Sequence, residues 1–383
     1  MKGIVILAVL VALPAHILFE NYTVKHGFLG LINFGEEFQE SALPEVKEIS
    51  PVTSSQRGYD GQFYAQLALH PGLTEPGLVN ALDSPEYRSR RIGMPFLAFC
   101  LGLGKTAWVL EIYALLNFFF WLALLLVILK IVGYTRPRDL LLAFALLWST
   151  GTLISVAKSL TDFPATALGA LAVFSNGNYV MAALLLGTSG LVKETSVLSF
   201  AAVPWGRRRE RLDVKHLFIS TLILLLPITL WFIYVHVRIP SGLPLRGNFT
   251  IPFFGIAHKL WSSLYGLATG TDTTISKQLM ILSESLAPLS LLVQATYLTF
   301  KPRFSSEAWR FGIGFVILFS LIGESIWVEQ FAYCRVLLPL TFSFNMLIHE
   351  HEFNQGYLTW YLLGNGGMYS LALHTVLKMV IPI

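Results

Sequence analysis

The sequence is poor in charged residues: Asp, Glu, Lys and Arg make up only 13% of its 383 residues. A soluble globular domain carries about 25%, so this chain has roughly half the usual share. Hydrophobic residues account for 54%, and the mean hydropathy is +0.62. This composition excludes an ordinary water-soluble globule and an intrinsically disordered chain.

Cysteine is also scarce. Cys100 and Cys334 both lie in apolar surroundings, and their spacing fits neither a disulfide framework nor a metal-binding motif. The net charge of +4 is too small to indicate nucleic acid as a partner. No Walker A motif or glycine-rich phosphate loop is present. The class that remains is a polytopic membrane protein.

Long apolar runs predict an all-α fold with about eleven transmembrane helices, because a bilayer core about 30 Å thick needs about 20 apolar residues per helix. The predicted spans are 4–19, 107–133, 138–157, 162–175, 178–192, 195–205, 216–237, 279–299, 311–328, 331–348 and 357–380. The first is interpreted as an uncleaved signal anchor, although residues 12–15 leave cleavage open. The fourth to sixth are short, so we expect broken helices that line a cavity walled by protein. Residues 1–383 are predicted to form one integral membrane domain.

Three basic loops set the expected orientation, because basic loops stay on the cytoplasmic side. They contain Arg136 and Arg138; Arg207, Arg208, Arg209, Arg211 and Lys215; and Lys301, Arg303 and Arg310. Alternating spans place all three on one side. Two long loops, 20–106 and 238–278, then face outward. The apolar run 92–104 is predicted to lie in the outer interface as a helix and not to cross the membrane.

Charged residues near the membrane gather on the predicted outer side. Because charge at membrane depth is costly, such residues usually face a wet cavity and a substrate. They are Asp60, Glu111, Lys158, Asp162, Lys193, Glu194, Glu284, Glu324, Glu329 and Arg335. For Glu111 and Lys158, marking the end of a span is an equally good explanation. Lys193 and Glu194 stand between two short apolar runs, which favours a functional role, with an ordinary loop ion pair as the alternative.

Asp60 stands in the most informative stretch, residues 58–64, between two glycines and among aromatic residues. Gly58 and Gly61 predict a tight turn that lets a ligand approach the backbone. The spacing of the apolar residues that follow predicts an amphipathic helix at the outer surface. Two interpretations of Asp60 stay open, a functional carboxylate and the N-cap of that helix.

Other polar and aromatic residues have alternative interpretations too. Arg88, Arg90 and Arg91 either bind a ligand or anchor the interfacial helix to lipid headgroups. The aromatic residues of the second outer loop, around Trp261, either stack on a sugar or only mark the interface. Residues 349–352, His-Glu-His-Glu, lack the i, i+4 spacing of a zinc motif, so we interpret them as a solvated polar turn in a cytoplasmic loop.

In four places along the chain the sequence resembles the GT-C superfamily of multispanning glycosyltransferases, which use lipid-phosphate-linked sugars. These places are residues 59–64; residues 87–91 with Pro95; residues 161–164 with 193–195; and Glu329 with Tyr333, Arg335 and Pro339. The chain has a single Asp in residues 59–61 where some members have a paired-acid DxD motif, so a metal requirement stays open. It also lacks the WWD-type motif of the oligosaccharyltransferase branch.

The resemblance implies that a hexose passes, with inversion, from a polyprenyl-phosphate donor to a lipid, glycan or protein acceptor. It implies a mannosyltransferase-like enzyme whose site faces outward from a bacterial inner membrane, with an endoplasmic reticulum membrane as the alternative. Asp60 is the expected catalytic base. The residues expected to bind the donor phosphate are Arg88, Arg90, Arg91, Lys193 and Arg335. Those expected to orient these cations are Asp162, Glu194 and Glu329.

Two other functions compete with this interpretation. A secondary transporter or lipid flippase also uses intramembrane charges and broken helices, but such proteins often show two similar halves, and no internal repeat is evident here. A non-catalytic membrane subunit would leave the outer-side charges without a purpose. We therefore expect an enzyme, with transport as the alternative.

Overall fold

The computed structural model describes residues 2–51, 56–175, 178–203, 214–239, 247–269, 275–329 and 331–380. Within these ranges every regular element is a helix, and extended backbone pairs only at two isolated bridges, Thr23 with Gly27 and Phe249 with Ile322. The predicted all-α class is confirmed.

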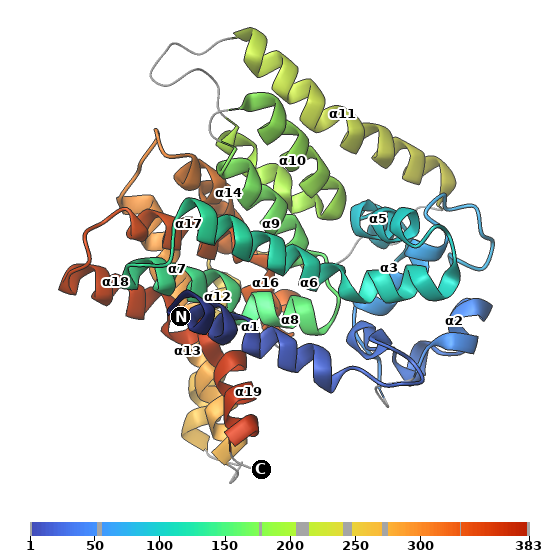
Figure 1. The fold of residues 1–383 in the computed structure, drawn as a ribbon, viewed down its shortest axis with the longest axis horizontal. Coiled ribbons are helices and arrows are strands. Elements are labelled where there is room, and N and C mark those ends of the chain that lie inside the picture. The colour runs from blue at the N-terminus through green and yellow to red at the C-terminus, as the bar shows by residue number, and fades with distance from the viewer. Residues whose placement is uncertain are drawn as a thin grey trace.

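The predicted first outer loop folds into several short helices on one side of the molecule (Figure 1). They follow α1 (Lys2–Glu20) in the order η1 (Leu29–Ile32), η2 (Glu36–Phe38), α2 (Pro44–Ile49), α3 (Gly61–Leu69), α4 (Pro85–Ser89) and α5 (Gly93–Leu101). Helix α5 falls inside the apolar run 92–104, where a helix was expected. Its Phe96 and Leu101 side chains are exposed, as in a helix that meets an apolar environment.

Within the described ranges, fewer helices than predicted are long and apolar enough to cross a membrane. The middle of the chain forms α6 (Thr106–Ile131), α7 (Pro137–Leu147), α8 (Thr150–Ala157), α9 (Asp162–Val173), α10 (Tyr179–Val192), the 3₁₀ helix η3 (Glu194–Ala202) and α11 (Val214–Arg238). Among the described residues only α6 and α11 qualify on their own, and α7 with α8 makes a third if the pair is one span bent by 47°. Length and composition thus support two or three full spans and not the predicted eleven.

The C-terminal third is more broken than its apolar runs predict. It forms α12 (Phe254–Thr269), α13 (Ile275–Phe300), α14 (Glu307–Leu321), α15 (Glu324–Val328), α16 (Ala332–Val336), α17 (Leu338–His349), α18 (Gln355–Asn365), η4 (Gly366–Tyr369) and α19 (Ser370–Val380). The predicted span 331–348 is divided at Leu337, where Pro339 in the first turn of α17 begins a new helix. The span 311–328 is divided at Gly323, which is extended with ψ 173°.

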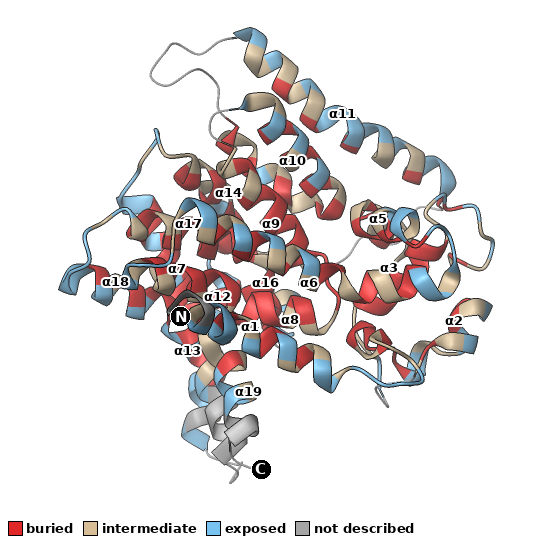
Figure 2. Ribbon diagram, viewed as in Figure 1, coloured by how far each residue is buried: buried red, intermediate tan, exposed pale blue. Residues whose placement is uncertain are grey.

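Helix α11 shows the apolar surface that membrane association requires. Of its described residues only Ser220, Leu224, Ile228 and Val235 are buried, and Figure 2 shows most of the helix as exposed or intermediate. Phe218 and Val237 are 68% and 77% exposed. Contiguous apolar surface of this kind marks contact with lipid or with a partner, so α6 and α11 support a membrane protein.

Two opposite ends of the helical body can be distinguished along α6. With 26 residues this helix is about 39 Å long. Near its first end, Glu111 accepts a hydrogen bond from the Phe28 amide at 3.0 Å, so the first loop lies there. Trp231, near the last turns of α11, donates to the Ser89 carbonyl at 2.9 Å, which places the end of α11 beside the same loop.

The predicted cytoplasmic loops meet one another just beyond the other end of α6. Arg138 donates to the His351 carbonyl at 2.7 Å, and His349 bonds to Asp139 at 2.9 Å. Arg303 pairs with Glu350. These contacts agree with the predicted shared side for the loops at 136–138 and 301–303. Arg207, Arg208, Arg209 and Arg211 of the remaining loop lie outside the described residues.

The helix that follows Asp60 is a core helix, so the prediction of an amphipathic surface helix is wrong. All nine residues of α3 are buried. Its polar side faces loop backbone and not water: Gln62 accepts from the Gly35 amide at 3.0 Å, and Gln66 accepts from the Leu43 amide and donates to the Ala81 carbonyl, each at 2.8 Å. The glutamines that make the pattern look amphipathic therefore hold the first loop together.

The glycines beside Asp60 admit the chain's own backbone, whereas the sequence predicts the approach of a ligand. Gly58 has φ +68°, and a Cβ added there would lie 2.4 Å from the Gly35 amide nitrogen. A Cβ at Gly61 would lie 2.4 Å from the Lys158 carbonyl oxygen. Close backbone packing thus fixes the turn that carries Asp60 against the end of α8.

We predict that Gly61→Ala lowers the free energy of unfolding by about 1–3 kcal/mol, because a methyl group cannot fit against the Lys158 carbonyl without a backbone shift. The matched control is Gly266→Ala in α12, where nothing lies within 4 Å of the added Cβ. Alanine favours a helix over glycine by up to about 1 kcal/mol, so the control should be neutral or stabilising. Thermal unfolding in detergent measures both, and equal effects of the two substitutions would contradict this packing.

Candidate functional site

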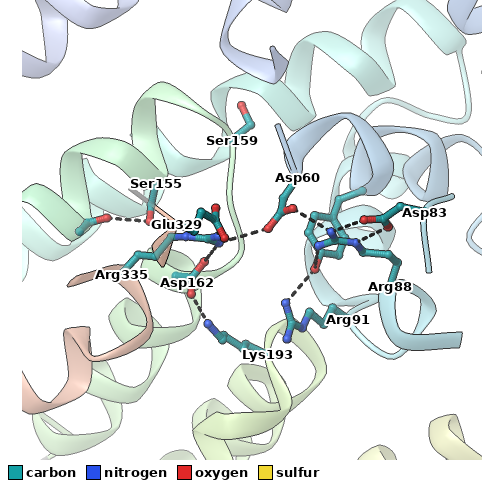
Figure 3. A network of polar contacts seen from close by, with 12 residues as sticks. Asp60, Asp83, Arg88, Arg91, Ser155, Ser159, Asp162, Lys193, Glu329 and Arg335 are labelled. Atoms are coloured by element: carbon teal, nitrogen blue, oxygen red, sulfur yellow. Dashed lines mark hydrogen bonds and ion pairs between the residues drawn. The ribbon is translucent and has the colours of Figure 1, made fainter. Parts of the chain in front are cut away.

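Asp60 lies between two arginines that come from distant parts of the chain (Figure 3). Its Oδ1 accepts from Arg88 Nη2 at 2.8 Å, and its Oδ2 accepts from Arg335 Nη1 at 3.3 Å. Although Asp60 stands at the N-cap position of α3, its side chain makes no capping hydrogen bond. The carboxylate is therefore committed to the arginines, and the N-cap interpretation is wrong.

Arg335, in α16, is the centre of the arrangement because it contacts three acids. Besides Asp60, its guanidinium donates to Asp162 at 3.1 Å and to Glu329 at 2.8 Å. The guanidinium also lies 5.4 Å from the centre of the Tyr59 ring. The buried Nε of Arg335 has no hydrogen-bond partner among the described residues.

Lys193 extends this group from the other side. It pairs with Asp162, whose side chain is only 1% exposed. Asp162 opens α9 and Lys193 closes α10, so the ends of two short helices bring the pair together. The sequence predicts short or broken helices here. In the structure α9 begins at Asp162 and α10 ends directly before Lys193.

A second half of the site joins Arg88 to Arg91. Asp83 binds Arg88 through both oxygens, at 2.8 and 2.7 Å, and Glu194 binds Arg91 in the same way, at 2.8 and 2.7 Å. Both arginines also donate to the Tyr64 hydroxyl, at 3.3 and 2.9 Å. The Tyr64 hydroxyl therefore connects Arg88, which binds Asp60, to Arg91, which binds Glu194.

Arg90 points elsewhere, so the predicted cluster of three arginines is divided. It pairs with Glu86 at 2.5 Å, its guanidinium lies 5.7 Å from the Phe232 ring of α11, and its side chain is 39% exposed. Four other outer-side charges also make contacts outside the group: Glu111 with the Phe28 amide, Lys158 with Asn33, Glu284 with Lys259 and Glu324 with His258.

We call the nine charged side chains that converge the charge network. Its members are Asp60, Asp83, Arg88, Arg91, Asp162, Lys193, Glu194, Glu329 and Arg335. The four basic side chains are 6–8% exposed, whereas four of the five carboxylates are 24–44% exposed. The cations are thus buried, whereas most of the carboxylates are partly exposed to solvent. Every cation has at least one carboxylate partner.

The environment of Asp60 determines its protonation state. Burial alone would raise the pKa of this carboxyl, but the Arg88 and Arg335 guanidiniums outweigh burial and hold the pKa well below its usual range. Asp60 is therefore ionised at neutral pH. A carboxylate with such a lowered pKa is a weak base for as long as both arginines stay in place.

The arrangement can accept an anion by exchange, because each of its four cations already has a carboxylate partner that the anion would have to displace. Arginine binds phosphate oxygens through two parallel hydrogen bonds, and the outward carboxylates can accept from hydroxyls. In the described ranges no three His, Cys, Asp or Glu side chains are grouped so that they could hold a metal ion. No protein-family model matches this chain, and neither a curated protein nor a solved structure is significantly similar to it.

Sequence reasoning missed two members of the site. Asp83 precedes helix α4 and lies five residues before Arg88. This short spacing is the one sequence feature that could have indicated the pair. Tyr64 is in the aromatic stretch after Asp60, but an aromatic residue at helical spacing is usually a core residue. Tyr64 is indeed a core residue, with 1% of its surface exposed. Its hydroxyl nevertheless accepts hydrogen bonds from both Arg88 and Arg91.

We predict that Asp162→Asn destabilises the fold by about 3–5 kcal/mol, because the substitution leaves the buried Lys193 without its ion-pair partner. The matched control is Glu37→Gln, since the Glu37–Arg57 pair has side chains 56% and 82% exposed. An exposed pair contributes little, so the control should change stability by less than about 1 kcal/mol. Thermal unfolding in detergent is the measurement, and a fully stable Asp162→Asn protein would contradict a structural Lys193–Asp162 pair.

The lowered pKa of Asp60 also predicts a pH dependence of stability. The group contributes stability above its unfolded pKa of about 3.9 and loses it as the pH falls through the lower folded pKa. The difference in melting temperature between the wild type and Asp60→Asn should stay constant from about pH 8 to pH 5 and shrink below about pH 4. Shrinkage between pH 7 and pH 6 would mean that the arginines do not hold Asp60 in its charged form.

Proposed function

We propose that this chain is a polytopic membrane glycosyltransferase of GT-C type. In this proposal it transfers a hexose from a polyprenyl-phosphate donor to an acceptor at the outer face of a membrane, most simply a bacterial inner membrane. One observation carries the proposal: the Asp60 carboxylate lies between Arg88 and Arg335, within hydrogen-bond distance of both. The resemblance of residues 59–64 and of the stretch around Arg335 supports the same assignment.

Donor binding begins with an exchange of partners at Arg335. A polyprenyl-phosphate sugar carries a negative charge that competes with carboxylates for guanidinium hydrogen bonds. Asp60 and Glu329 are the partners most easily displaced, because their side chains are 24% and 44% exposed, whereas Asp162 is 1% exposed. The phosphate takes the vacated face of Arg335, and Asp162 keeps the guanidinium in place.

The same exchange activates Asp60. Once Arg335 turns to the phosphate, one of the two cations that lower the Asp60 pKa is neutralised, so this pKa rises and the carboxylate becomes a better base. Asp60 then takes the proton from the acceptor hydroxyl as its oxygen attacks the anomeric carbon. The bond from that carbon to the phosphate oxygen breaks, and the configuration is inverted. Arg335 and Arg88 stabilise the charge that develops on the leaving phosphate.

Other members of the charge network support these two arginines. Lys193 holds Asp162, and Glu194 binds Arg91, which reaches Arg88 through the Tyr64 hydroxyl. We assign Arg91 and Lys193 the role of holding the acids and arginines of the network in position for the phosphate. Arg90 has no place in this scheme because it pairs with Glu86.

The membrane body explains how such a donor arrives. The exposed apolar side chains of α11 offer a surface along which a polyprenyl tail can stay in lipid while its phosphate reaches the first loop. The bonds of Trp231 and Tyr234 to the backbone of that loop bring the end of α11 beside α4. In this proposal the shorter helices lie in the membrane beside the full spans α6 and α11.

Transport is the second candidate, and the bent α7–α8 pair favours it. The two helices meet at an angle of 47° near the charge network, as in the discontinuous helices of transporters. Radiolabelled polyprenyl-phosphate sugars separate the candidates. Transfer or release of sugar by the purified protein supports the enzyme, whereas accumulation in vesicles without transfer supports a transporter.

We predict that Asp60→Asn lowers sugar transfer by about 10²–10⁴-fold, the usual contribution of a positioned base. The fold should survive, because Arg88 keeps Asp83 and Arg335 keeps Asp162 and Glu329. The matched control is Asp83→Asn, which also removes a carboxylate from Arg88 but leaves Asp60 intact, and it should retain transfer within about tenfold. Near-normal transfer by Asp60→Asn would remove Asp60 from the mechanism.

A further inference from the structure

A second polar site lies far from the charge network, beyond the other end of α6. A cavity of about 350 Å³ opens between the end of α13 and the start of α18. The side chains that line it include Lys301, His351, Glu352, Asn354, Tyr357 and Trp360. Ligand pockets of small molecules begin at about 300 Å³, so the cavity can hold a compact polar group.

The lining presents one positive group on an aromatic wall. The Lys301 ammonium lies 5.0 Å from the centre of the Trp360 ring and 5.3 Å from that of Tyr297. Cation–π contacts of this length hold the ammonium in position. No carboxylate among the described residues pairs with Lys301, so its hydrogen-bond donors are open to an anion.

The lining also presents one negative group. Glu352 is exposed, and no basic side chain in the described part of the chain pairs with it. Lys301 and Glu352 line the same cavity but do not form an ion pair with each other. The cavity therefore offers separate partners for an anion and for a cation.

His351, which lies behind these two groups, is held in place by its neighbours and is itself uncharged. The Nε2 atom of His351 lies 2.7 Å from the Tyr297 hydroxyl and 3.0 Å from Arg303 Nη2. Because a guanidinium only donates, this nitrogen accepts and the imidazole is neutral. Burial, Arg303 and Lys301 lower the pKa of His351 in agreement with this. The expected solvated turn at 349–352 is thus tied to its neighbours at His349 and His351.

We propose that this cavity binds the headgroup of a zwitterionic phospholipid in the leaflet opposite the charge network. Lys301 would donate to the lipid phosphate, and Glu352 would accept from the headgroup amine. Lysine next to tryptophan and tyrosine is the side-chain set that membrane proteins place at headgroup level. The proposal rests on membrane association and not on glycosyl transfer.

Native mass spectrometry of the full chain in detergent tests this assignment with short-chain phosphatidylethanolamine and phosphatidylglycerol of equal tails. The wild type should bind phosphatidylethanolamine about tenfold more tightly, the size of one charge-assisted hydrogen bond. Lys301→Ala should weaken both lipids by a similar factor. Glu352→Gln should remove the preference and leave phosphatidylglycerol binding unchanged. The matched control is Lys105→Ala, because Lys105 lies 4.6 Å from the Trp108 ring near the other end of α6.

Each of several results would overturn the assignment. Equal binding of the two lipids by the wild type would exclude a site for the amine. An effect of Lys105→Ala as large as that of Lys301→Ala would show only general attraction of lysine to lipid. Equally tight binding of free phosphoethanolamine or inorganic phosphate would assign the cavity to a soluble ligand. Unchanged melting temperatures of the variants show that the fold is intact.

Discussion

The pairing of buried charge is the constraint on which the rest of the structure depends. Four basic side chains lie 6–8% exposed among apolar helices. An unpaired ion in such a place costs several kcal/mol, so each cation requires carboxylates in contact with it. Arg335 meets this requirement with three acids from three segments, and the short helices end where those acids must stand. The charge network thus constrains the path of the chain.

This network explains why so much of an apolar chain is broken into short pieces. If Asp162, Lys193 and Arg335 stood inside long continuous helices, their side chains could not all point to one place. At the ends of short helices the backbone can turn, so the three side chains can meet. The first loop follows the same rule. Its core helix α3 is held by close backbone contact at Gly61, and two glutamines pair with loop backbone. Packing and ion pairing together bring Asp60 within reach of Arg335.

Composition and apolar runs predict the helical class, the segments that carry the charge network and the short helices between residues 162 and 205, but not the breaks in the C-terminal third. Hydropathy predicts a single span over 331–348. In the structure a new helix begins at Leu338, with Pro339 in its first turn, and this divides the span. Local sequence patterns also do not predict long-range pairs. Asp60 and Arg335 are 275 positions apart, and no motif near either residue identifies the other as its partner. Arg88 and Arg91 are three positions apart and share one side, while Arg90 turns away, a distinction that residue type alone does not reveal.

In the proposed mechanism Arg335 exchanges Asp60 for the donor phosphate. The most direct measurement is a structure of the protein with a non-hydrolysable polyprenyl-phosphate sugar. We expect phosphate oxygens within hydrogen-bond distance of Arg335, with Asp162 still bound to that arginine and Asp60 turned toward the acceptor position. A complex in which Asp60, Arg88 and Arg335 keep their present contacts and the phosphate binds elsewhere would contradict it.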